Sequence, residues 1–353
     1  MEKPFVTIAM PALNEERYIG RALLSLRRIP DEIEYEILVL DGGSTDYTRP
    51  IVEMFSQADP RIRLVPNERR IQAAAINRAA SVADPRSRYI LRADCHADYP
   101  PGFVQSCLDA LEQSGAASVV VRMETVGATC FQKAVATAQN SRLGNGGSAH
   151  RTAGASRFVD HGHHALIRRD VFLALGGYDE SFSHNEDAEF DLRLREAGWP
   201  IWLNAAAAVG YYPRSTIASL ARQYFLHGRG RAKTVAKHRM MPKPRQLLPP
   251  LVVGIGLLAL LASPVEPYLL LVPLAYVAAA LLAGAVLAVR NASACSVGSG
   301  LAALVMHTSW AVGFTSTLLL GSPSSPAGQN RTKPVEAHQP RGPSSGLESE
   351  LLP

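Results

Sequence analysis

The sequence predicts an α/β fold in which a mostly parallel, Rossmann-like sheet is covered by helices on both faces and is followed by membrane helices. Short apolar strands alternate with helices through residues 1–125, which is typical of a parallel sheet buried on both faces. Polar clusters follow three of these strands, and from Leu247 onwards the chain contains long stretches with almost no charge. Together these observations exclude a disordered chain and predict a folded unit joined to a membrane region.

The elements of the first part follow one another in a regular order. Strands are expected over 5–11, 36–41, 61–65, 88–94 and 117–123, because each is a short run of mainly apolar residues. Helices are expected over 16–26, 47–55 and 71–80, with another beginning near Pro101. In open sheets of this kind, ligands bind beyond the carboxyl ends of the strands.

The second part is less regular. Residues 126–160 are rich in Gly, Ser and Ala and predict a mobile loop. A strand-like segment follows within 163–182, and 184–202 is expected to be a helix with acidic residues in its first turn. A further helix is expected over 217–240, which ends a folded domain of residues 1–240.

Residues 247–321 predict a membrane region with two or three helices. The apolar stretches are 247–262, 267–289 and 297–321, and a span needs about 20 residues. The second and third are long enough, whereas the first is short and interrupted by prolines, so it is expected to span or to lie at the interface. Lys and Arg crowd residues 222–245, which predicts a multi-pass plasma-membrane protein with its folded domain in the cytoplasm. The tail, 322–353, is rich in Pro and Ser and is expected to be disordered.

The four cysteines form no CxxC pair. This favours free thiols in a reducing compartment and gives no zinc signature. We expect no signal peptide, because the N-terminus holds only a short strand-like run.

The polar clusters at the strand ends are the first candidate sites. They read PALNE (11–15), DGGSTD (41–46) and DCHAD (94–98). Asp41 with its two following glycines suits the close approach of a base or ribose, although a capped turn explains the same residues. Asp94 and His96 suit Mn²⁺ or Mg²⁺, with a diphosphate completing the coordination, or they form a polar turn before Pro100.

Two further clusters lie later in the chain. Glu186 and Asp187 open the expected helix and provide a candidate general base, although acids are favoured in first turns in any case. The histidines of HGHH (161–164) have no metal-ligand spacing to other residues, so structural or substrate-contact roles are expected.

The basic stretch 222–234, which includes Arg229, could hold diphosphate oxygens or lie on anionic lipid. Nucleic acid is a weaker partner because the stretch adjoins apolar segments. Cys95 has no evident pair of base and orienting group, so a thiol nucleophile is not expected.

Taken together, the motifs PALNEE, DGGSTD, RADCHADYP, GGYDESF and NEDAEFDLRLREAGW resemble those of the family 2 glycosyltransferases in order and spacing. The resemblance covers roughly residues 4–235. The segments HGHHALIRRDVF and QYFLHGRGRAKT are similar, more narrowly, to the group of succinoglycan-biosynthesis glucosyltransferases.

The resemblance implies a GT-A fold, the fold of nucleotide-diphospho-sugar transferases, and a UDP-sugar donor. The implied roles are nucleotide binding for Pro11, Asn14, Glu15, Asp41 and Asp94, metal binding for Asp94 and His96, and catalysis by Asp187 as base with Glu186 beside it. His96 stands where the family carries an Asp, which leaves the identity of the divalent cation, Mn²⁺ or Mg²⁺, open. Arg229 is expected to contact the donor or a lipid acceptor.

These residues predict an inverting transferase that moves a sugar, with glucose favoured, to a polyprenyl-diphosphate-linked oligosaccharide in exopolysaccharide biosynthesis. Other polysaccharide-biosynthesis proteins are possible partners. The chain lacks the Gln-x-x-Arg-Trp motif of processive synthases after Gln223, so addition of one sugar is favoured over polymerisation. A processive synthase and a non-catalytic nucleotide-sugar sensor in an export complex remain alternatives.

Overall fold

The computed structural model describes residues 3–148, 151 and 154–321. The strands are β1 (Phe5–Ala12), β2 (Glu34–Asp41), β3 (Ile62–Pro66), β4 (Tyr89–Arg92), β5 (Ala97–Asp98), β6 (Ser118–Thr125), β7 (Arg157–Val159), β8 (His163–Arg168) and β9 (Ile201–Tyr211). The helices before the membrane region are α1 (Ile19–Leu26), α2 (Thr48–Ala58), α3 (Gln72–Val82), α4 (Phe103–Ser114), α5 (Cys130–Gln139), α6 (Arg142–Asn145), α8 (Arg169–Ala174), α9 (Glu186–Glu196) and α10 (Ile217–His238). The membrane region holds α11 (Pro244–Ala262), α12 (Leu271–Arg290) and α13 (Ser299–Leu320), with the short 3₁₀ turns η1 (Pro267–Leu270) and η2 (Ala294–Gly298).

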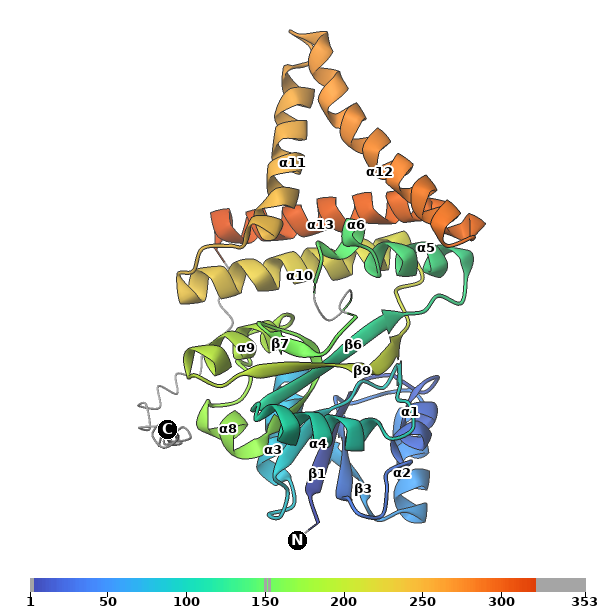
Figure 1. The fold of residues 1–353 in the computed structure, drawn as a ribbon, viewed down its shortest axis with the longest axis vertical. Helices are drawn as coiled ribbons and strands as arrows, with labels where there is room; N and C mark the ends of the chain where they lie inside the picture. Colours follow the sequence, from blue (N-terminus) through green and yellow to red (C-terminus); the bar gives the residue numbers. More distant parts are fainter. Residues whose placement is uncertain (1–2, 149–150, 152–153, 322–353) are drawn as a thin grey trace, which may run out of the picture.

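The strands form one sheet in the order β3-β2-β1-β4-β8-β6-β9-β5, with β7 paired to β9 (Figure 1). The first four strands run parallel, as predicted. The pairing sets Ala12 opposite Asp41 and Ala9 opposite Arg92. Because parallel strands end at the same edge of a sheet, the three polar clusters gather there.

The other half of the sheet is mixed. β8 runs antiparallel to both β4 and β6, β9 runs parallel to β6, and β5 and β7 pair antiparallel with β9. β8 therefore brings residues from the middle of the chain against the strand that carries Arg92.

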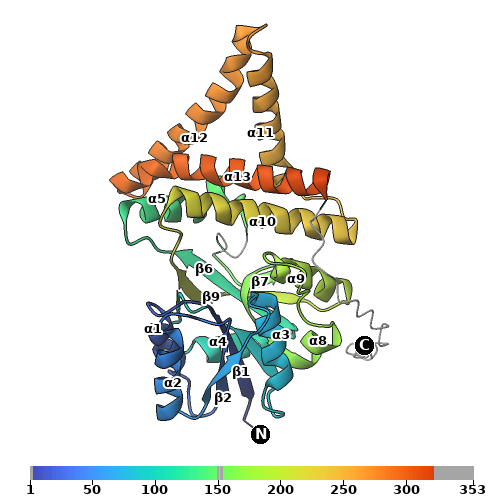
Figure 2. The ribbon, with the colours of Figure 1, turned by 180° about the vertical axis from the view of Figure 1, so that it is seen from behind.

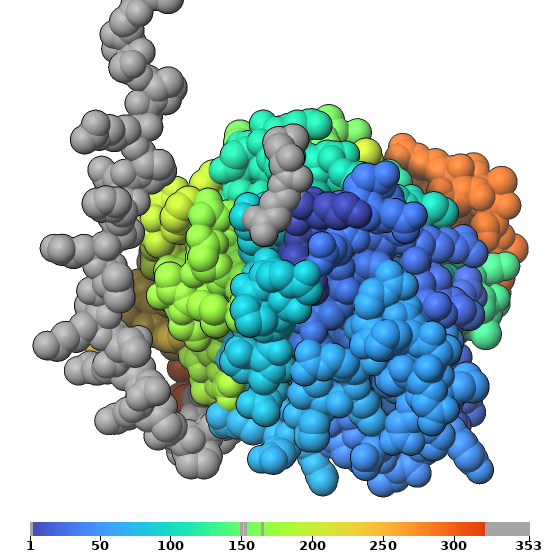
Figure 3. Space-filling view, turned by 90° about the horizontal axis from the view of Figure 1, so that it is seen from below, coloured from blue at the N-terminus to red at the C-terminus, as the bar shows by residue number. Residues whose placement is uncertain are grey.

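Helices cover both faces, as predicted. α1, α2 and α4 pack on one face around Leu23, Val52 and Leu108, and α3, α8 and α9 pack on the other around Ile76 and Phe190. Seen from the end away from the membrane helices, the surface is formed mainly by the first hundred residues, in blue and cyan, and by the yellow-green segment that includes α8 (Figure 3).

The predicted loop over 126–160 is wrong for its first part, which forms α5 and α6. The helix α5 is Ala-containing and begins with a capping box, in which Gln132 N–H donates to Thr129 Oγ1 and the Gln132 side chain accepts from the Thr129 N–H. Gly and Ser around it obscured this start signal. The expected helix over 184–202 ends at Glu196, because Gly198 adopts a left-handed conformation and Pro200 leads into β9.

α10 lies side by side with α13, whereas α11 and α12 project away from the rest of the molecule (Figures 1 and 2). The α10–α13 contact is close because both helices present a glycine. A Cβ atom added at Gly228 would lie 2.2 Å from the Trp310 carbonyl oxygen, and one at Gly313 would lie 2.1 Å from that of Phe225. Gly284 and Gly300 make an equally close contact between α12 and α13.

The structure contains three helices long and apolar enough to cross a membrane: Pro244–Ala262, Pro267–Arg290 and Ala294–Leu320. The first is continuous despite Pro249 and Pro250. The third is the most buried against the rest of the protein: 39% of its apolar stretch is buried, compared with 6% and 11% for the first and second. The predicted disordered tail, 322–353, lies outside the described residues.

The expectation that the cysteines are free is wrong for two of them. Cys130 in α5 and Cys295 in η2 form a disulfide across 165 positions of sequence. Cys95 and Cys107 are free and buried. The pair could not be predicted from spacing because its two cysteines are 165 positions apart.

Candidate functional site

The loops after β1 and β2 are bound to each other. The Asn14 side-chain oxygen accepts from the Thr45 N–H (2.9 Å), and the Asn14 N–H donates to Ser44 Oγ (2.9 Å). The Glu15 N–H donates to Thr48 Oγ1 (2.7 Å). Asn14 also adopts a left-handed backbone conformation, φ 57°, which Asn tolerates better than most residues. The first two predicted nucleotide-binding loops therefore form one braced surface at the sheet edge.

Asp41 is buried at the end of β2 and caps its own turn. Its carboxylate accepts from the backbone N–H groups of Gly43 (3.2 Å) and Ser44 (3.1 Å), and Arg49 Nε lies 3.8 Å away. This is the capped turn that the sequence left open as an alternative to nucleotide contact. The two readings are compatible, because a capped carboxylate holds the turn that a base or ribose would approach.

The loop after β4 places its two candidate ligands among different partners. Asp94 is buried and accepts from Gln72 Nε2 (3.2 Å). His96 Nδ1 lies 3.6 Å from Glu15 Oε1, and its ring meets Tyr211 edge-on. Burial opposes protonation of His96, but the nearby carboxylates of Glu15 and Asp94 raise its pKa above the usual value. The sheet thus joins the third cluster to the first.

Within the described residues, no group of three His, Cys, Asp or Glu side chains gathers as a complete metal site. Asp94 and His96 nevertheless offer a carboxylate and an imidazole, the donor set that suits Mn²⁺ or Mg²⁺ when substrate oxygens complete the coordination. These residues fit a cation shared with a diphosphate rather than one enclosed by protein.

Arg92, at the end of β4, links the two acidic clusters. It is 3% exposed, and its Nη1–H donates to Glu186 Oε1 (3.2 Å). Asp187 Oδ2 lies 3.9 Å from Nη1 and Asp94 Oδ1 lies 3.8 Å from Nε. Burial opposes its charge, but these three carboxylates outweigh that effect and raise the pKa of Arg92. One buried cation therefore allows three carboxylates to lie close together.

Asp187 is held by its own helix and by β8. Its Oδ1 accepts from the Ala188 N–H (2.7 Å), and its Oδ2 lies 2.8 Å from His163 Nδ1. His163 Nε2 in turn lies 3.8 Å from Asp94 Oδ2. His163 therefore stands between the candidate base and the candidate metal ligand.

The pKa values of the two predicted catalytic carboxylates are shifted in opposite directions. Burial raises the pKa of Glu186 despite the nearby charge of Arg92. Burial also opposes ionisation of Asp187, but the hydrogen bond with His163 and the charges of His161 and Arg92 hold its pKa well below the usual range. Asp187 is also the more exposed side chain, 17% against 5%. It is therefore the group able to accept a proton from a ligand at neutral pH.

The sequence did not single out Arg92, and for His161 and His163 it predicted only structural or substrate-contact roles, without naming the carboxylates that they contact. His161 Nδ1 lies 2.7 Å from Asp191 Oδ2, one helical turn beyond Asp187. The signal was present in the HGHH segment, since residues two apart on a strand point to the same face. It could not be used without knowing that this strand faces α9.

A cavity of about 720 Å³ opens beside these carboxylates and extends to the membrane helices. Glu186, Asp187, His161 and His163 line one end, and residues of α11, α12 and α13 line the other. Of the basic residues of α10, Arg231 lines this cavity. Arg229 is not among its lining residues; its guanidinium lies over the Phe225 ring, 5.9 Å from the centroid. Two positions along a helix turn a side chain by about 200°, so the cavity does not support the expected contact of Arg229 with donor or acceptor.

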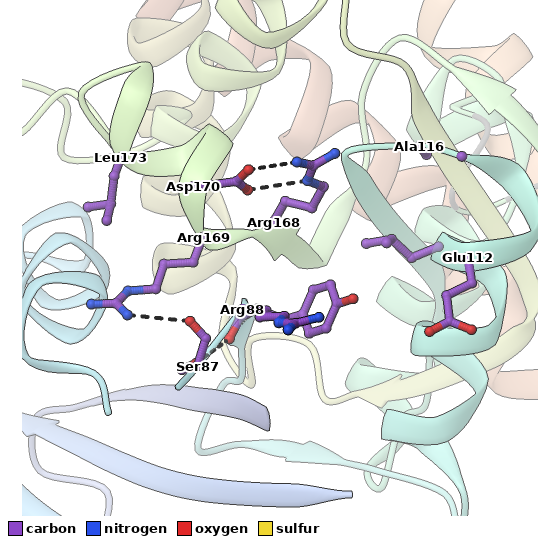
Figure 4. A pocket seen from close by; sticks show the side chains of 11 residues that line it. Ser87, Arg88, Glu112, Ala116, Arg168, Arg169, Asp170 and Leu173 are labelled. Carbon is purple, nitrogen blue, oxygen red and sulfur yellow. Dashed lines mark hydrogen bonds and ion pairs between the residues drawn. The ribbon is translucent and has the colours of Figure 1, made fainter. Parts of the chain in front are cut away.

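A second hollow, of about 760 Å³, lies where β4 begins, at the opposite edge of the sheet (Figure 4). Arg168 donates to Asp170 and Arg169 donates to the Ser87 carbonyl oxygen (3.3 Å), as drawn in Figure 4. These guanidinium groups hold strand and helix ends together. The hollow is remote from the polar clusters, so the site at the carboxyl edge is the candidate functional site.

Comparison with known proteins agrees with the resemblance noted in the motifs. The model of the family described as Glycosyl transferase family 2 matches residues 7–176. The succinoglycan biosynthesis protein ExoA of Rhizobium meliloti (strain 1021) is 45% identical over 313 residues, which cover 88% of this chain and 94% of that protein.

A more distant relative comes from Methanococcus voltae. It is a dolichyl N-acetyl-α-D-glucosaminyl phosphate 3-β-D-2,3-diacetamido-2,3-dideoxy-β-D-glucuronosyltransferase, 24% identical, covering 66% of this chain and 74% of its own. Among solved structures, the mannosyltransferase PcManGT from Pyrobaculum calidifontis, in complex with GDP-Man and Mn²⁺, has a TM-score of 0.54 at 19% identity. The match covers 89% of this chain and 86% of that one.

Proposed function

Since the chain belongs to glycosyl transferase family 2, we propose that it transfers one sugar with inversion from a UDP-sugar, glucose being the expected sugar, to a polyprenyl-diphosphate-linked saccharide during exopolysaccharide biosynthesis. The GT-A fold and the enzyme class expected from the motifs are confirmed by these relatives and by the fold of PcManGT. The observation that carries the proposal is the Asp187 carboxylate, held by His163 beside a cavity that extends to the membrane helices.

Asp187 is the proposed catalytic base. An acceptor hydroxyl placed in the cavity would give its proton to the Asp187 carboxylate as its oxygen attacks the anomeric carbon of the donor. The bond from that carbon to the diphosphate oxygen breaks on the opposite side, which inverts the configuration. His163 and the Ala188 N–H keep the carboxylate oriented, and Glu186 keeps Arg92 in place.

The donor is proposed to lie along the carboxyl edge, with its nucleoside over the braced loops of Asn14 and Asp41 and its diphosphate toward Asp94 and His96. A divalent cation held by Asp94 and His96 would balance the negative charge that develops on the leaving diphosphate. ExoA supports the pathway, the name of the Methanococcus voltae relative supports a lipid-linked acceptor, and the ligands of PcManGT support a nucleotide sugar with a divalent cation.

We further propose that the three apolar helices attach the enzyme to the plasma membrane, with the catalytic domain on the cytoplasmic side. Candidate spans at the C-terminus and the basic segment before α11 support this orientation. An acceptor held in the same bilayer would then reach the cavity from the membrane.

The test uses membranes containing the full chain, radiolabelled UDP-glucose, Mn²⁺ and a lipid extract of the native host. Wild type, Asp187→Asn and the control Asp170→Asn, which alters a surface carboxylate at the other edge of the sheet, are compared. We expect label in one discrete lipid product for wild type and the control, and at least a 100-fold loss for Asp187→Asn.

Other results would change specific parts of the proposal. Equal labelling by Asp187→Asn would remove this residue as base. A ladder of long products would favour a processive synthase. Binding of UDP-sugar donors without any labelled product would favour a non-catalytic nucleotide-sugar sensor in an export complex.

A further inference from the structure

The lining of the cavity beside Asp187 also includes arginines and apolar side chains that have no role in the proposed reaction. The lining includes Arg142 from the start of α6, Arg231 from α10 and Arg245 from the start of α11. Arg245 packs over Gly146, with its Cβ 3.8 Å from the position a Gly146 Cβ would occupy. Three elements that are distant in sequence thus bring guanidinium groups to one cavity.

Among the described residues, none of these three guanidinium groups forms an ion pair with a carboxylate, whereas the half-buried or buried Arg92 and Arg193 of the same domain do. Arg231 is half-buried. Burial lowers its pKa, and Arg245 contributes in the same direction while Asp187 opposes. A partly desolvated cation next to another cation is unfavourable unless an anion binds there.

His184 and His227, which also line the cavity, favour the neutral form. Burial, together with the neighbouring cations, lowers the pKa of His227 to about 3 and lowers that of His184. The carboxylates that line the cavity, Glu186 and Asp187, lie beside Arg92. They form no ion pair with the three arginines, whose positive charge therefore remains available to an anion.

The membrane helices add apolar side chains to the lining. Leu248 and Val252 of α11 and Trp310 of α13 line the cavity, and exposed apolar side chains such as Leu251 and Ile255 continue along α11. The Tyr276 hydroxyl donates to His307 Nδ1, and His307 Nε2 donates to the Leu143 carbonyl oxygen (both 2.8 Å), which fixes α6 against α12 and α13. The lining therefore combines the candidate base, three arginines and an apolar surface that continues along α11.

We propose that Arg142, Arg231 and Arg245 bind the diphosphate of a polyisoprenoid acceptor, whose first isoprene units lie against Leu248, Val252 and Trp310. This assignment rests on the proposed function for its acceptor class and adds the residues that hold it. The sugar attached to the diphosphate extends from the arginines toward Asp187. Arginine suits this position because its planar fork binds phosphate oxygens in pairs.

The donor's diphosphate is a poorer occupant of this position. Neither Asn14 nor Asp41, in the proposed nucleotide loops, lines this cavity, and neither do Asp94 and His96. The apolar surface has no counterpart in a nucleotide sugar, whereas an isoprenoid chain matches it.

The test measures binding without the sugar donor, so that it does not depend on activity. The full chain in nanodiscs is titrated with fluorescent farnesyl diphosphate as probe. Arg231→Gln and Arg245→Gln are compared with Arg231→Lys and with Arg222→Gln, which alters an exposed arginine of the same helix outside the cavity. We expect the two Gln variants to weaken probe binding at least tenfold, Arg231→Lys to weaken it less, and Arg222→Gln to bind as wild type does.

Competitors distinguish the sources of the anion. Farnesyl diphosphate should compete at least 30-fold better than pyrophosphate, farnesol or phosphatidic acid in the disc, and UDP with Mn²⁺ should leave the probe bound. Equal binding by all variants would overturn the assignment even in an active enzyme. Displacement of the probe by UDP would assign the arginines to the donor diphosphate instead. Equal competition by pyrophosphate would show that the apolar side chains do not bind the isoprene units. Arginine-dependent binding in a chain without transferase activity would support the site and reject the proposed reaction.

Discussion

At the scale of single residues, the site depends on pairs formed between distant elements. Arg92 and Glu186 are 94 positions apart, and His163 and Asp187 are 24 apart. The acidic motifs could be found from the sequence because their residue types and strand-end positions are local signals. Their partners could not be found, because Arg92 reads as the last residue of an ordinary strand and His163 as one of several histidines.

The contact between His163 and Asp187 predicts a specific loss. A hydrogen bond to a charged group contributes about 1.5–3 kcal/mol, so we expect His163→Ala to lower kcat about tenfold to hundredfold. Because His163 lowers the pKa of Asp187, its loss raises that pKa, and activity should begin to fall at a higher pH as the solution is acidified. Initial rates across pH 4–8 would measure both effects. His163→Asn, which restores a donor, should recover part of the rate; equal rates for wild type and His163→Ala would exclude the positioning role.

The position of His96 beside Glu15 predicts how metal removal acts. If Asp94 and His96 share a cation with the donor, EDTA should weaken UDP binding about tenfold to hundredfold, and His96→Ala should abolish most of that difference. Calorimetric titration of UDP with Mn²⁺ and with EDTA gives the comparison. His238→Ala, whose imidazole contacts Glu189 instead, is the matched control. A full metal response in His96→Ala would place the cation elsewhere.

At the scale of elements, α10 has a packing role that its charge did not suggest. The sequence predicted a basic helix that could hold diphosphate oxygens or lie on anionic lipid, and its bounds were nearly right. The sequence did not indicate a role for Gly228 and Gly230, which allow α10 to pack closely against its neighbours. Gly228 faces α13, while a Cβ at Gly230 would lie 2.4 Å from the His184 carbonyl oxygen, in the loop that precedes the base. Asn185 Nδ2 also donates to Thr234 Oγ1 on α10.

Gly230 therefore predicts an effect opposite to helix propensity. Alanine is favoured over glycine in a helix by about 1 kcal/mol, but at this position the added carbon must push the 184–185 loop away. We expect Gly230→Ala to destabilise the protein by about 1–3 kcal/mol and to lower kcat more than it raises KM for the donor. Thermal unfolding in detergent and initial rates measure these quantities.

The matched substitution is Gly254→Ala in α11, where an added Cβ meets no atom within 4 Å. It should leave the melting temperature unchanged or higher. A Gly230→Ala protein as stable and active as the Gly254→Ala protein would show that the loop tolerates displacement.

At the scale of the whole molecule, the alternation of strands and helices was sufficient to predict the parallel half of the sheet, because each element buries its own apolar residues. The mixed half was not predictable in the same way. β8 and β9 owe their places to partners far along the chain, and α13 reads as a simple span although much of it is covered by α10 and α5.

The arrangement of α11, α12 and α13 predicts which segments cross the membrane. α11 and α12 project together, and their connection carries Val265, 89% exposed. We expect Val265→Cys to react with a membrane-impermeant maleimide in intact cells. Met241→Cys, before α11 and 84% exposed, should react only after permeabilisation. Because α13 lies along α10, Leu320→Cys at its end should behave like Met241→Cys. Labelling of Leu320→Cys from outside would instead make α13 a third span.

The close contact of Gly228 with α13 has a consequence for how the protein can be divided. The change of composition at Leu247 looks like a border between a catalytic module and an anchor. In space there is no such border: α13 covers Leu220, Ala232 and Val235 of α10, and α11 and α13 supply part of the cavity wall. A chain ended before α11 would expose an apolar helix face to water and lose one wall of its own active site. The two parts can be told apart in the sequence, but in the fold they share a packed interface and one cavity wall. Membrane helices taken from another protein would therefore not replace α11–α13.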